Sequence, residues 1–239
     1  MIELENALTY EDWLWERTQD RCQDLGIEFV SIRMGKNAQA FDLYAEITQL
    51  IADIVTITDR TDLSIRGDFE TASDAGMVTI VPDTTVLADT PTECQGSTHD
   101  ARADAADACQ AVTDAQTLKA WLEGELSTAC DEETAELTAT LNAAGARLGA
   151  MAAEKAANFA TWAELAATSG EDAAAFEARM TAIFNTGYDD GSISRSDAGV
   201  TLGTVPDSCQ DSTKNALEDL TQLLATLTQE LTLCDWLEQ

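Results

Sequence analysis

Positive charge is scarce in this chain. Lysine occurs only at Lys36, Lys119, Lys155 and Lys214, and 13 basic residues stand against 44 acidic ones, so the formal net charge is -31. Nucleic-acid binding depends on clustered Lys and Arg side chains that neutralise phosphates. The composition therefore excludes DNA and RNA as expected partners.

The acidic excess also indicates the salt environment. At molar salt the Debye length falls to roughly 3 Å, which removes most of the repulsion between like charges on such a surface. The composition suits a protein that folds and works in concentrated salt, and it resembles proteins of salt-accumulating halophiles. The alternative is an ordinary acidic protein from a GC-rich genome, in which Ala, Thr and Asp are also abundant.

Long apolar runs are missing as well. No uninterrupted apolar stretch approaches the ~20 residues that a membrane-spanning helix requires. The first six residues, MIELEN, are acidic and lack the basic and apolar regions of a secretory signal peptide. We therefore expect that the protein is made in the cytosol and does not insert into a membrane.

Catalytic motifs are absent too. The chain contains no GxSxG, no P-loop and no GxGxxG, and its single histidine, His99, offers no argument for a general base. Aromatic residues make up only 6% of the chain, which is few for an enzyme that works with carboxylates alone, such as a glycosidase. We expect no enzymatic activity, no catalytic residue and no bound cofactor.

The cysteines form no metal-binding pattern. None belongs to a CxxC pair, and one histidine is too few to assist a zinc site. Two cysteines on one helix at the spacing of 94 and 109, or of 209 and 234, are too far apart for the ~6 Å that a disulfide spans. Any bridge must therefore join different segments, and otherwise the thiols stay free. The candidates are Cys22, Cys94, Cys109, Cys130, Cys209 and Cys234.

An internal duplication is the strongest positive signal. The segment PTECQGSTHDA at residues 91–101 matches PDSCQDSTKNA at residues 206–216, and Trp121-Leu122 matches Trp236-Leu237 at the same separation of 115 residues. Fixed-period similarity is typical of a supersecondary unit that is used more than once. The sequence thus predicts two related modules.

Both copies contain an amphipathic helix with one apolar stripe. The stripe is built from small residues in the first copy and from leucines in the second, so we expect another backbone to approach the first copy closely. Trp121 and Trp236, near the ends of these helices, are interpreted as core or interface packing. The interface candidates are Trp121, Trp236, Ala101, Ala105 and Ala108.

The remaining pattern predicts a mainly α protein, a helical bundle with an internal duplication and minor β structure. We expect helices at residues 9–24, 37–55, 131–169 and 171–185, and strands at residues 27–34 and 77–81 inside or beside loops. The predicted divisions are an N-terminal helix and strand (1–35), the first copy (36–128), a long Ala-rich connecting helix (129–169) and the second copy (170–239).

One acidic segment resembles the second half of an EF-hand loop. Residues 184–197 contain Asp189-Asp190-Gly191, a central isoleucine and a terminal Asp197, which makes calcium binding by Asp189, Asp190 and Asp197 one interpretation. The other interpretation is a structural acidic turn. We also expect residues 73–76 of the first copy to match residues 196–199, because both read Ser-Asp-Ala-Gly.

These features favour a non-enzymatic structural or assembly subunit adapted to high salt. A virion component of a halophilic virus, such as a head, tail or connector protein, combines cytosolic synthesis with later exposure to oxidant. The expected partners are protein chains, in a homo-oligomer or larger assembly. The alternatives are an extracellular calcium-dependent binding module and a cytosolic helical adaptor of a halophile.

Overall fold

The computed structural model describes residues 2–237, and it describes the side chains of residues 10–210 and 213–237. Within these residues the chain forms helices and loops and no strand. The α-helices are α1 (Ile2–Thr58), α2 (Asp62–Asp74), α3 (Gln95–Ser169), α4 (Ala173–Asp189) and α5 (Gln210–Leu237), and the 3-10 helices are η1 (Thr92–Cys94) and η2 (Asp207–Cys209).

The chain divides into two compact units, residues 1–127 and residues 128–239. Helix α3 contributes its first part to unit 1 and its remainder to unit 2. Each unit has its own buried apolar residues and its own disulfide.

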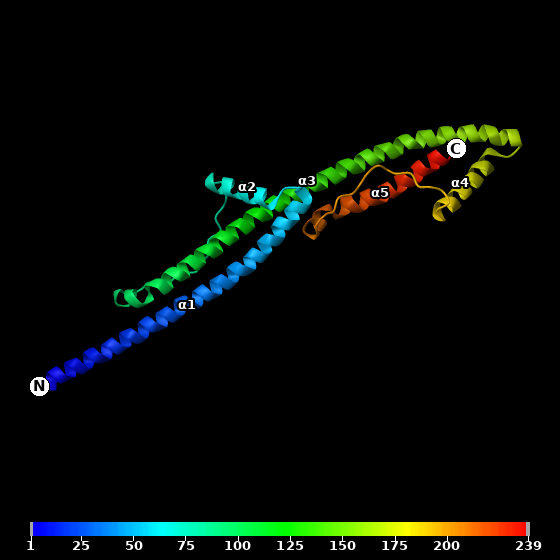
Figure 1. The fold of residues 1–239 in the computed structure, drawn as a ribbon. Coiled ribbons are helices and arrows are strands. Elements are labelled where there is room, and N and C mark those ends of the chain that lie inside the picture. Colours follow the sequence, from blue (N-terminus) through cyan, green and yellow to red (C-terminus); the bar gives the residue numbers. More distant parts are fainter. Residues whose placement is uncertain (1, 238–239) are drawn as a thin grey trace. The chain divides into compact units, whose positions relative to one another are not determined.

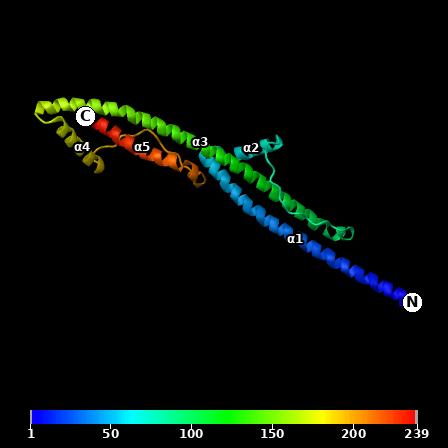
Figure 2. The same cartoon turned by 180° about the vertical axis from the view of Figure 1, so that it is seen from behind.

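In unit 1, α1 lies alongside the first part of α3 (Figures 1 and 2). A disulfide joins Cys22 on α1 to Cys94 at the end of η1, and an ion pair joins Glu46 on α1 to Lys119 on α3. The short helix α2 follows α1, and residues 75–91 then run back along α3 as an extended segment, which we call the unit 1 strap.

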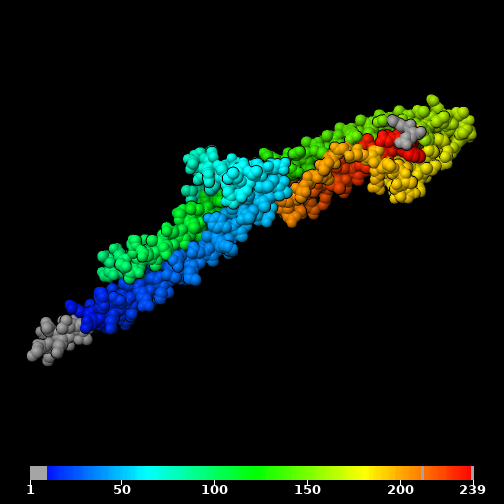
Figure 3. All heavy atoms as spheres, in the orientation of Figure 1, coloured from blue at the N-terminus to red at the C-terminus, as the bar shows by residue number. Residues whose placement is uncertain are grey.

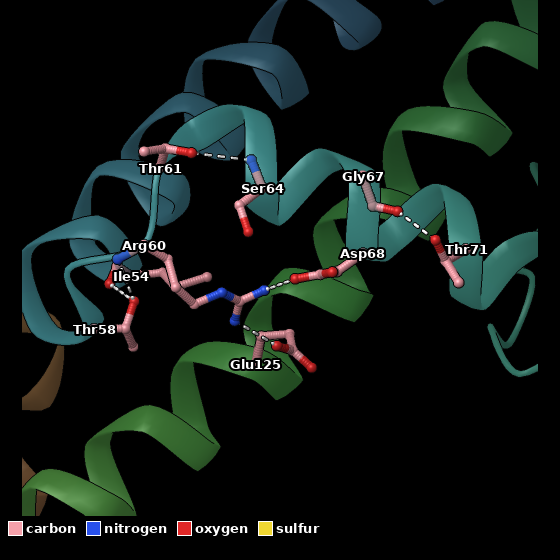
Figure 4. A network of polar contacts seen from close by, with 9 residues as sticks. All are labelled: Ile54, Thr58, Arg60, Thr61, Ser64, Gly67, Asp68, Thr71 and Glu125. Atoms are coloured by element: carbon pink, nitrogen blue, oxygen red, sulfur yellow. Dashed lines mark hydrogen bonds and ion pairs between the residues drawn. The ribbon is translucent and has the colours of Figure 1, made fainter.

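The turn between α1 and α2 is held by Arg60 (Figure 4). Its guanidinium pairs with Asp68 on α2 and, at 3.1 Å, with Glu125 on α3. The hydroxyl of Thr61 caps α2 by accepting a hydrogen bond from the backbone N–H of Ser64. One arginine thus connects the short helix to the long one.

Unit 2 repeats this order of elements. The second part of α3 is followed by α4, an extended segment at residues 190–206 (the unit 2 strap), η2 and α5, which lies alongside α3 (Figure 1). Cys130 on α3 is bonded to Cys209 at the end of η2. The apolar core of this unit centres on Leu220 and Leu227 of α5 together with Leu137 of α3.

The two units share one register from the short helix to the last helix. The 115-residue separation relates the ends of α2 and α4 at Asp74 and Asp189, and it relates Gly76 and Gly191, which have φ of 69° and 77°. The predicted match of residues 73–76 to residues 196–199 is therefore wrong, because the turn glycine of the second copy is Gly191.

Each strap binds its helix through threonine hydroxyls. The backbone N–H of Val81 donates to Oγ1 of Thr117 at 3.0 Å, and that of Ser196 donates to Oγ1 of Thr232 at 2.9 Å. Donor and acceptor are both displaced by 115 residues between the units. The duplication therefore extends well beyond the segments that resemble each other in sequence.

The first helices of the two units also correspond, at a different separation. The disulfide cysteines Cys22 and Cys130 are 108 residues apart, and the same separation relates the buried side chains of Phe29 and Leu137. The burial patterns of residues 22–58 and 130–166 follow each other at this separation. Helix α1 and the second part of α3 are thus equivalent elements.

The predicted strand at residues 27–34 is wrong, because α1 continues through it without a break. Gly26 and Gly35, which border the predicted strand, do not interrupt the helix, because a glycine inside a helix costs only about 1 kcal/mol. The burial of Phe29, with 0% of its surface exposed, belongs to a helical face that also contains Cys22 and Ala40. Packing against α3 outweighs the β-branched composition of this stretch.

Residues 77–81 form no strand: the backbone N–H of Val81 donates to the Thr117 hydroxyl of α3, and that of Met77 donates to the carbonyl of Ala72 in α2. Helix α2 lies in a segment for which we predicted neither a helix nor a strand. The predicted helices at residues 131–169 and 171–185 are confirmed in type, and the former is the second part of α3.

Candidate interaction surface on helix α1

The two tryptophans predicted at an interface pack inside their own units. The ring of Trp121 contacts Phe69 of α2, with centroids 5.5 Å apart, and the ring of Trp236 contacts Phe184 of α4 at 5.8 Å. Phe69 and Phe184 are themselves 115 residues apart. The core-packing interpretation of both tryptophans fits these contacts, and a contact with another copy stays a prediction.

The alanine stripe of the first copy faces the inside of unit 1. Ala105 and Ala108 are buried, with 0% and 5% of their surface exposed, and Ala101 is half-buried. The matching stripe in α5 is buried too, at Leu220 and Leu227. The small residues thus serve the packing of unit 1, and their contact with a second copy also stays a prediction.

Four of the six candidate cysteines form disulfides, and both bridges join different segments, as expected. Cys22 pairs with Cys94, and Cys130 pairs with Cys209. Cys109 and Cys234 are free thiols. Burial is the largest cause that raises the pKa of each of these thiols. Because the thiolate is the reactive form, neither is an activated nucleophile.

The acidic turns bind their own backbone. The carboxylate of Asp190 accepts a hydrogen bond from the N–H of Ser192 at 2.9 Å, and that of Asp197 accepts one from the N–H of Gly199 at 2.8 Å. Asp189 is the last residue of α4. Among the residues that the structure describes, no three His, Cys, Asp or Glu side chains converge as metal ligands. The structural-turn interpretation accounts for these contacts.

A polar cluster distinguishes the interior of unit 1. Lys36 donates to Asp83 at 2.7 Å, and their side chains are 17% and 7% exposed. Burial acts to raise the pKa of Asp83, but hydrogen bonds from Lys36, Cys109 and Thr85 outweigh it and lower that pKa below its ordinary value. In unit 2, Ala144 is equivalent to Lys36, Ala198 to Asp83 and Leu224 to Cys109, and all three are buried. The apolar replacement indicates a packing role for this cluster.

A row of exposed apolar side chains lies on α1 of unit 1. Its side chains recur at alternating steps of three and four residues, with the polar Asn37 in the fourth place. Between 38% and 75% of each apolar side chain is exposed. We call this set the α1 stripe: Ile27, Val30, Met34, Asn37, Phe41 and Tyr44.

A groove adjoins the α1 stripe at Ile27 and Val30. It has a volume of about 850 Å³ and lies where α1 passes the start of α3, next to the disulfide of Cys22. Leu14 and Trp15 of α1 supply much of its apolar lining, and Glu93 and Ser97 border it from the other side. In Figure 3 the first part of α3 lies against α1 along one side of that helix.

The corresponding face in unit 2 is not apolar. At the 108-residue separation, the five apolar residues of the α1 stripe become small or polar residues, all exposed: Ala135, Thr138, Asn142, Gly149 and Ala152. Unit 2 thus forms the same module without large apolar side chains on this face. The apolar stripe is therefore an addition to unit 1 that folding of the module does not require.

The beginning of α1 also repeats a sequence motif of α3 and α5. A threonine followed after three residues by Trp-Leu occurs at 117–122 in α3, at 232–237 in α5 and at 9–14 in α1. Leu122 and Leu237 are buried, with 0% and 4% of their surface exposed, whereas Leu14 is 42% exposed. This third copy presents a core motif on the surface.

Sequence reasoning missed the α1 stripe because residues 27–34 were assigned to a strand. The signal was present in the alternating steps of three and four residues from Ile27 to Tyr44, which span two heptads. The two glycines hid it, since they divided the stripe into separate predicted elements.

Comparison with known proteins gives no relative. No protein-family model matches the chain, and neither the curated proteins nor the solved structures contain a match. Within residues 2–237 no helix is both long and apolar enough to cross a membrane. The function must be argued from the surface of the molecule itself.

Proposed function

We propose that this protein is a non-enzymatic structural subunit that assembles with other protein chains through the exposed apolar face of α1. The observation that carries the proposal is the α1 stripe, which is exposed in unit 1 and absent from the equivalent face of unit 2. Contiguous exposed apolar surface on an otherwise polar protein is typical of an interaction site.

The construction of the two units supports a mechanical role. Each is a set of long helices closed by one disulfide, and the pairs Cys22–Cys94 and Cys130–Cys209 join residues 72 and 79 positions apart. Crosslinks that close long loops stabilise a fold by restricting the unfolded chain. Such units keep their shape under conditions in which an uncrosslinked bundle of this size would open.

The setting that fits best is an oxidising exterior at high salt. Disulfides persist in oxidising surroundings, and the net charge of -31 suits concentrated salt. A virion component of a halophilic virus meets both conditions. Under this proposal the protein has no bound cofactor and no nucleic-acid partner.

Light scattering behind a sizing column, in molar salt and over a range of protein concentrations, tests the proposal. We expect a discrete oligomer or a filament, because the apolar face of α1 is then covered. A monomer at every concentration would contradict an assembly role for the isolated protein.

A further inference from the structure

We infer that the α1 stripe pairs with the α1 stripe of a second copy, as two parallel helices in register. This inference rests on the proposed function and names the partner of the same surface. Four observations carry it: the spacing of the stripe, the charge beside it, the position of Asn37 and the matching face of unit 2.

The spacing is that of a coiled-coil seam. Ile27, Met34 and Phe41 repeat every seven residues, and Val30, Asn37 and Tyr44 repeat in the same way three residues later. Two helices with such seams pack side chain into groove along their length. The seam spans 17 residue steps, about 26 Å at the rise of an α-helix.

Charge favours a second copy over a foreign partner. Helix α1 has no carboxylate between Glu28 and Asp42, although the chain carries 44 acidic residues. The α1 positions that flank the seam are uncharged except for Arg33, which pairs with Asp104 of α3 at 2.6 Å. Asp107 lies on the same side, in the hollow that also contains Asn37. Two copies of this acidic chain can meet here without repulsion between carboxylates of their α1 helices. A basic partner would instead favour a surface that presents carboxylates, which this stretch of α1 lacks.

Asn37 determines the direction of pairing. In a parallel pair in register, equivalent positions of the two helices form a layer, so the two Asn37 amides face each other and hydrogen-bond. In an antiparallel pair centred on this seam, Asn37 would face Met34 or Phe41, so its amide would have no polar side chain opposite it. Only the parallel arrangement satisfies the polar residue within the apolar seam.

Unit 2 supplies matched controls for the test. Phe41 corresponds to Gly149 and Met34 to Asn142, and all four positions are exposed. A Cβ added at Gly149 meets no atom within 4 Å, so a side chain there disturbs nothing. Glutamate can therefore be substituted at equivalent positions of two helical faces, one with the apolar stripe and one without it.

The first experiment measures the dissociation constant of self-association by light scattering in molar salt. Phe41→Glu and Met34→Glu should each raise it at least tenfold, whereas Gly149→Glu and Asn142→Glu should leave it within twofold of wild type. Circular dichroism should show unchanged helix content in all four variants. An oligomer that persists in Phe41→Glu and Met34→Glu would overturn this inference and the placement of the interface on α1, but not assembly itself. A monomeric wild type would overturn assembly as well.

The second experiment tests direction and register. Under mild oxidation, Asn37→Cys should form a covalent dimer, because equivalent positions in a parallel pair come within the distance that a disulfide spans. Asn142→Cys, an exposed asparagine in unit 2, should remain uncrosslinked. Self-association that depends on Phe41 without crosslinking through position 37 would overturn the parallel arrangement.

Discussion

The ion pair of Lys36 and Asp83 shows how a single pair of residues can differ between two otherwise equivalent interiors. Unit 1 buries a charged pair where unit 2 has Ala144 and Ala198. The desolvation cost of a buried pair is repaid only while both partners are present. The unit 2 pair shows that the module also folds with two methyl groups at these positions.

We predict that Asp83→Ala destabilises the protein by about 2 to 3 kcal/mol, because it leaves Lys36 without its partner. The double variant Lys36→Ala with Asp83→Ala should lose less than the single variant, since it leaves no buried charge without a partner, as in unit 2. Urea unfolding in molar salt measures both. Equal losses in the two variants would contradict this account.

The same carboxylate predicts a dependence on acid. The pKa of Asp83 is lowered in the folded protein from its ordinary value of 3.8. Its contribution to stability is therefore present above that value and is lost as the pH falls through the lowered pKa. The difference in unfolding free energy between wild type and Asp83→Asn should shrink as the pH is taken from 5 to 2. A difference that stays constant over this range would show that the carboxylate charge does not matter.

At the scale of elements, the disulfides are the most direct feature to test. Denaturing the native protein in an alkylating reagent without reductant should label two thiols, Cys109 and Cys234, and prior reduction should raise the number to six. Intact mass gives the count and peptide mapping gives the positions. Six labels before reduction would support the alternative of a cytosolic adaptor with free thiols.

The straps give a second prediction at this scale. Thr117→Val and Thr232→Val should each cost roughly 1 to 2 kcal/mol, because a strap N–H loses the hydroxyl that accepts its hydrogen bond. Hydrogen exchange at the amides of Val81 and Ser196 should speed up in the matching variant only. Thr226→Val, at an exposed position of α5, is the control. Unchanged exchange in both straps would mean that the threonines do not hold them.

The elements that sequence reasoning found are those with uninterrupted helical periodicity. The Ala-rich helix at residues 131–169 and the duplicated helices met no competing signal. Gly26 and Gly35 lower the local helix propensity of α1, but the helix continues through them because Phe29 and Ala40 are buried by packing. The pairing of Cys22 with Cys94 depends on the strap, which returns the chain so that α3 starts beside α1 and runs parallel to it, and no local pattern encodes this return. The α1 stripe needed a continuous helix before its heptad spacing became visible.

For the whole molecule, the two units combine one architecture with two surfaces. The helices, straps, disulfides and Phe–Trp contacts recur at constant separations, so these shared features are what the module needs to fold. The features that differ include the Lys36–Asp83 pair inside and the α1 stripe outside. Because the stripe adds nothing to the shared fold, its function must lie in contacts beyond it, which is why the proposed assembly is placed there.

The charge of the whole chain gives the last prediction. The chain has 44 acidic and only 13 basic residues, a formal net charge of -31, so its carboxylates repel one another strongly at low ionic strength. Lowering the salt from molar to millimolar lengthens the Debye length from roughly 3 Å to more than 30 Å, so the repulsion then acts across each unit. The melting temperature should fall steeply over this range. The helical signal in far-ultraviolet circular dichroism measures it. The disulfides should hold each unit's chain together as its helices separate, so the loss should reverse when salt is restored. A melting temperature that does not change with salt would contradict adaptation to high salt and would favour an ordinary acidic protein.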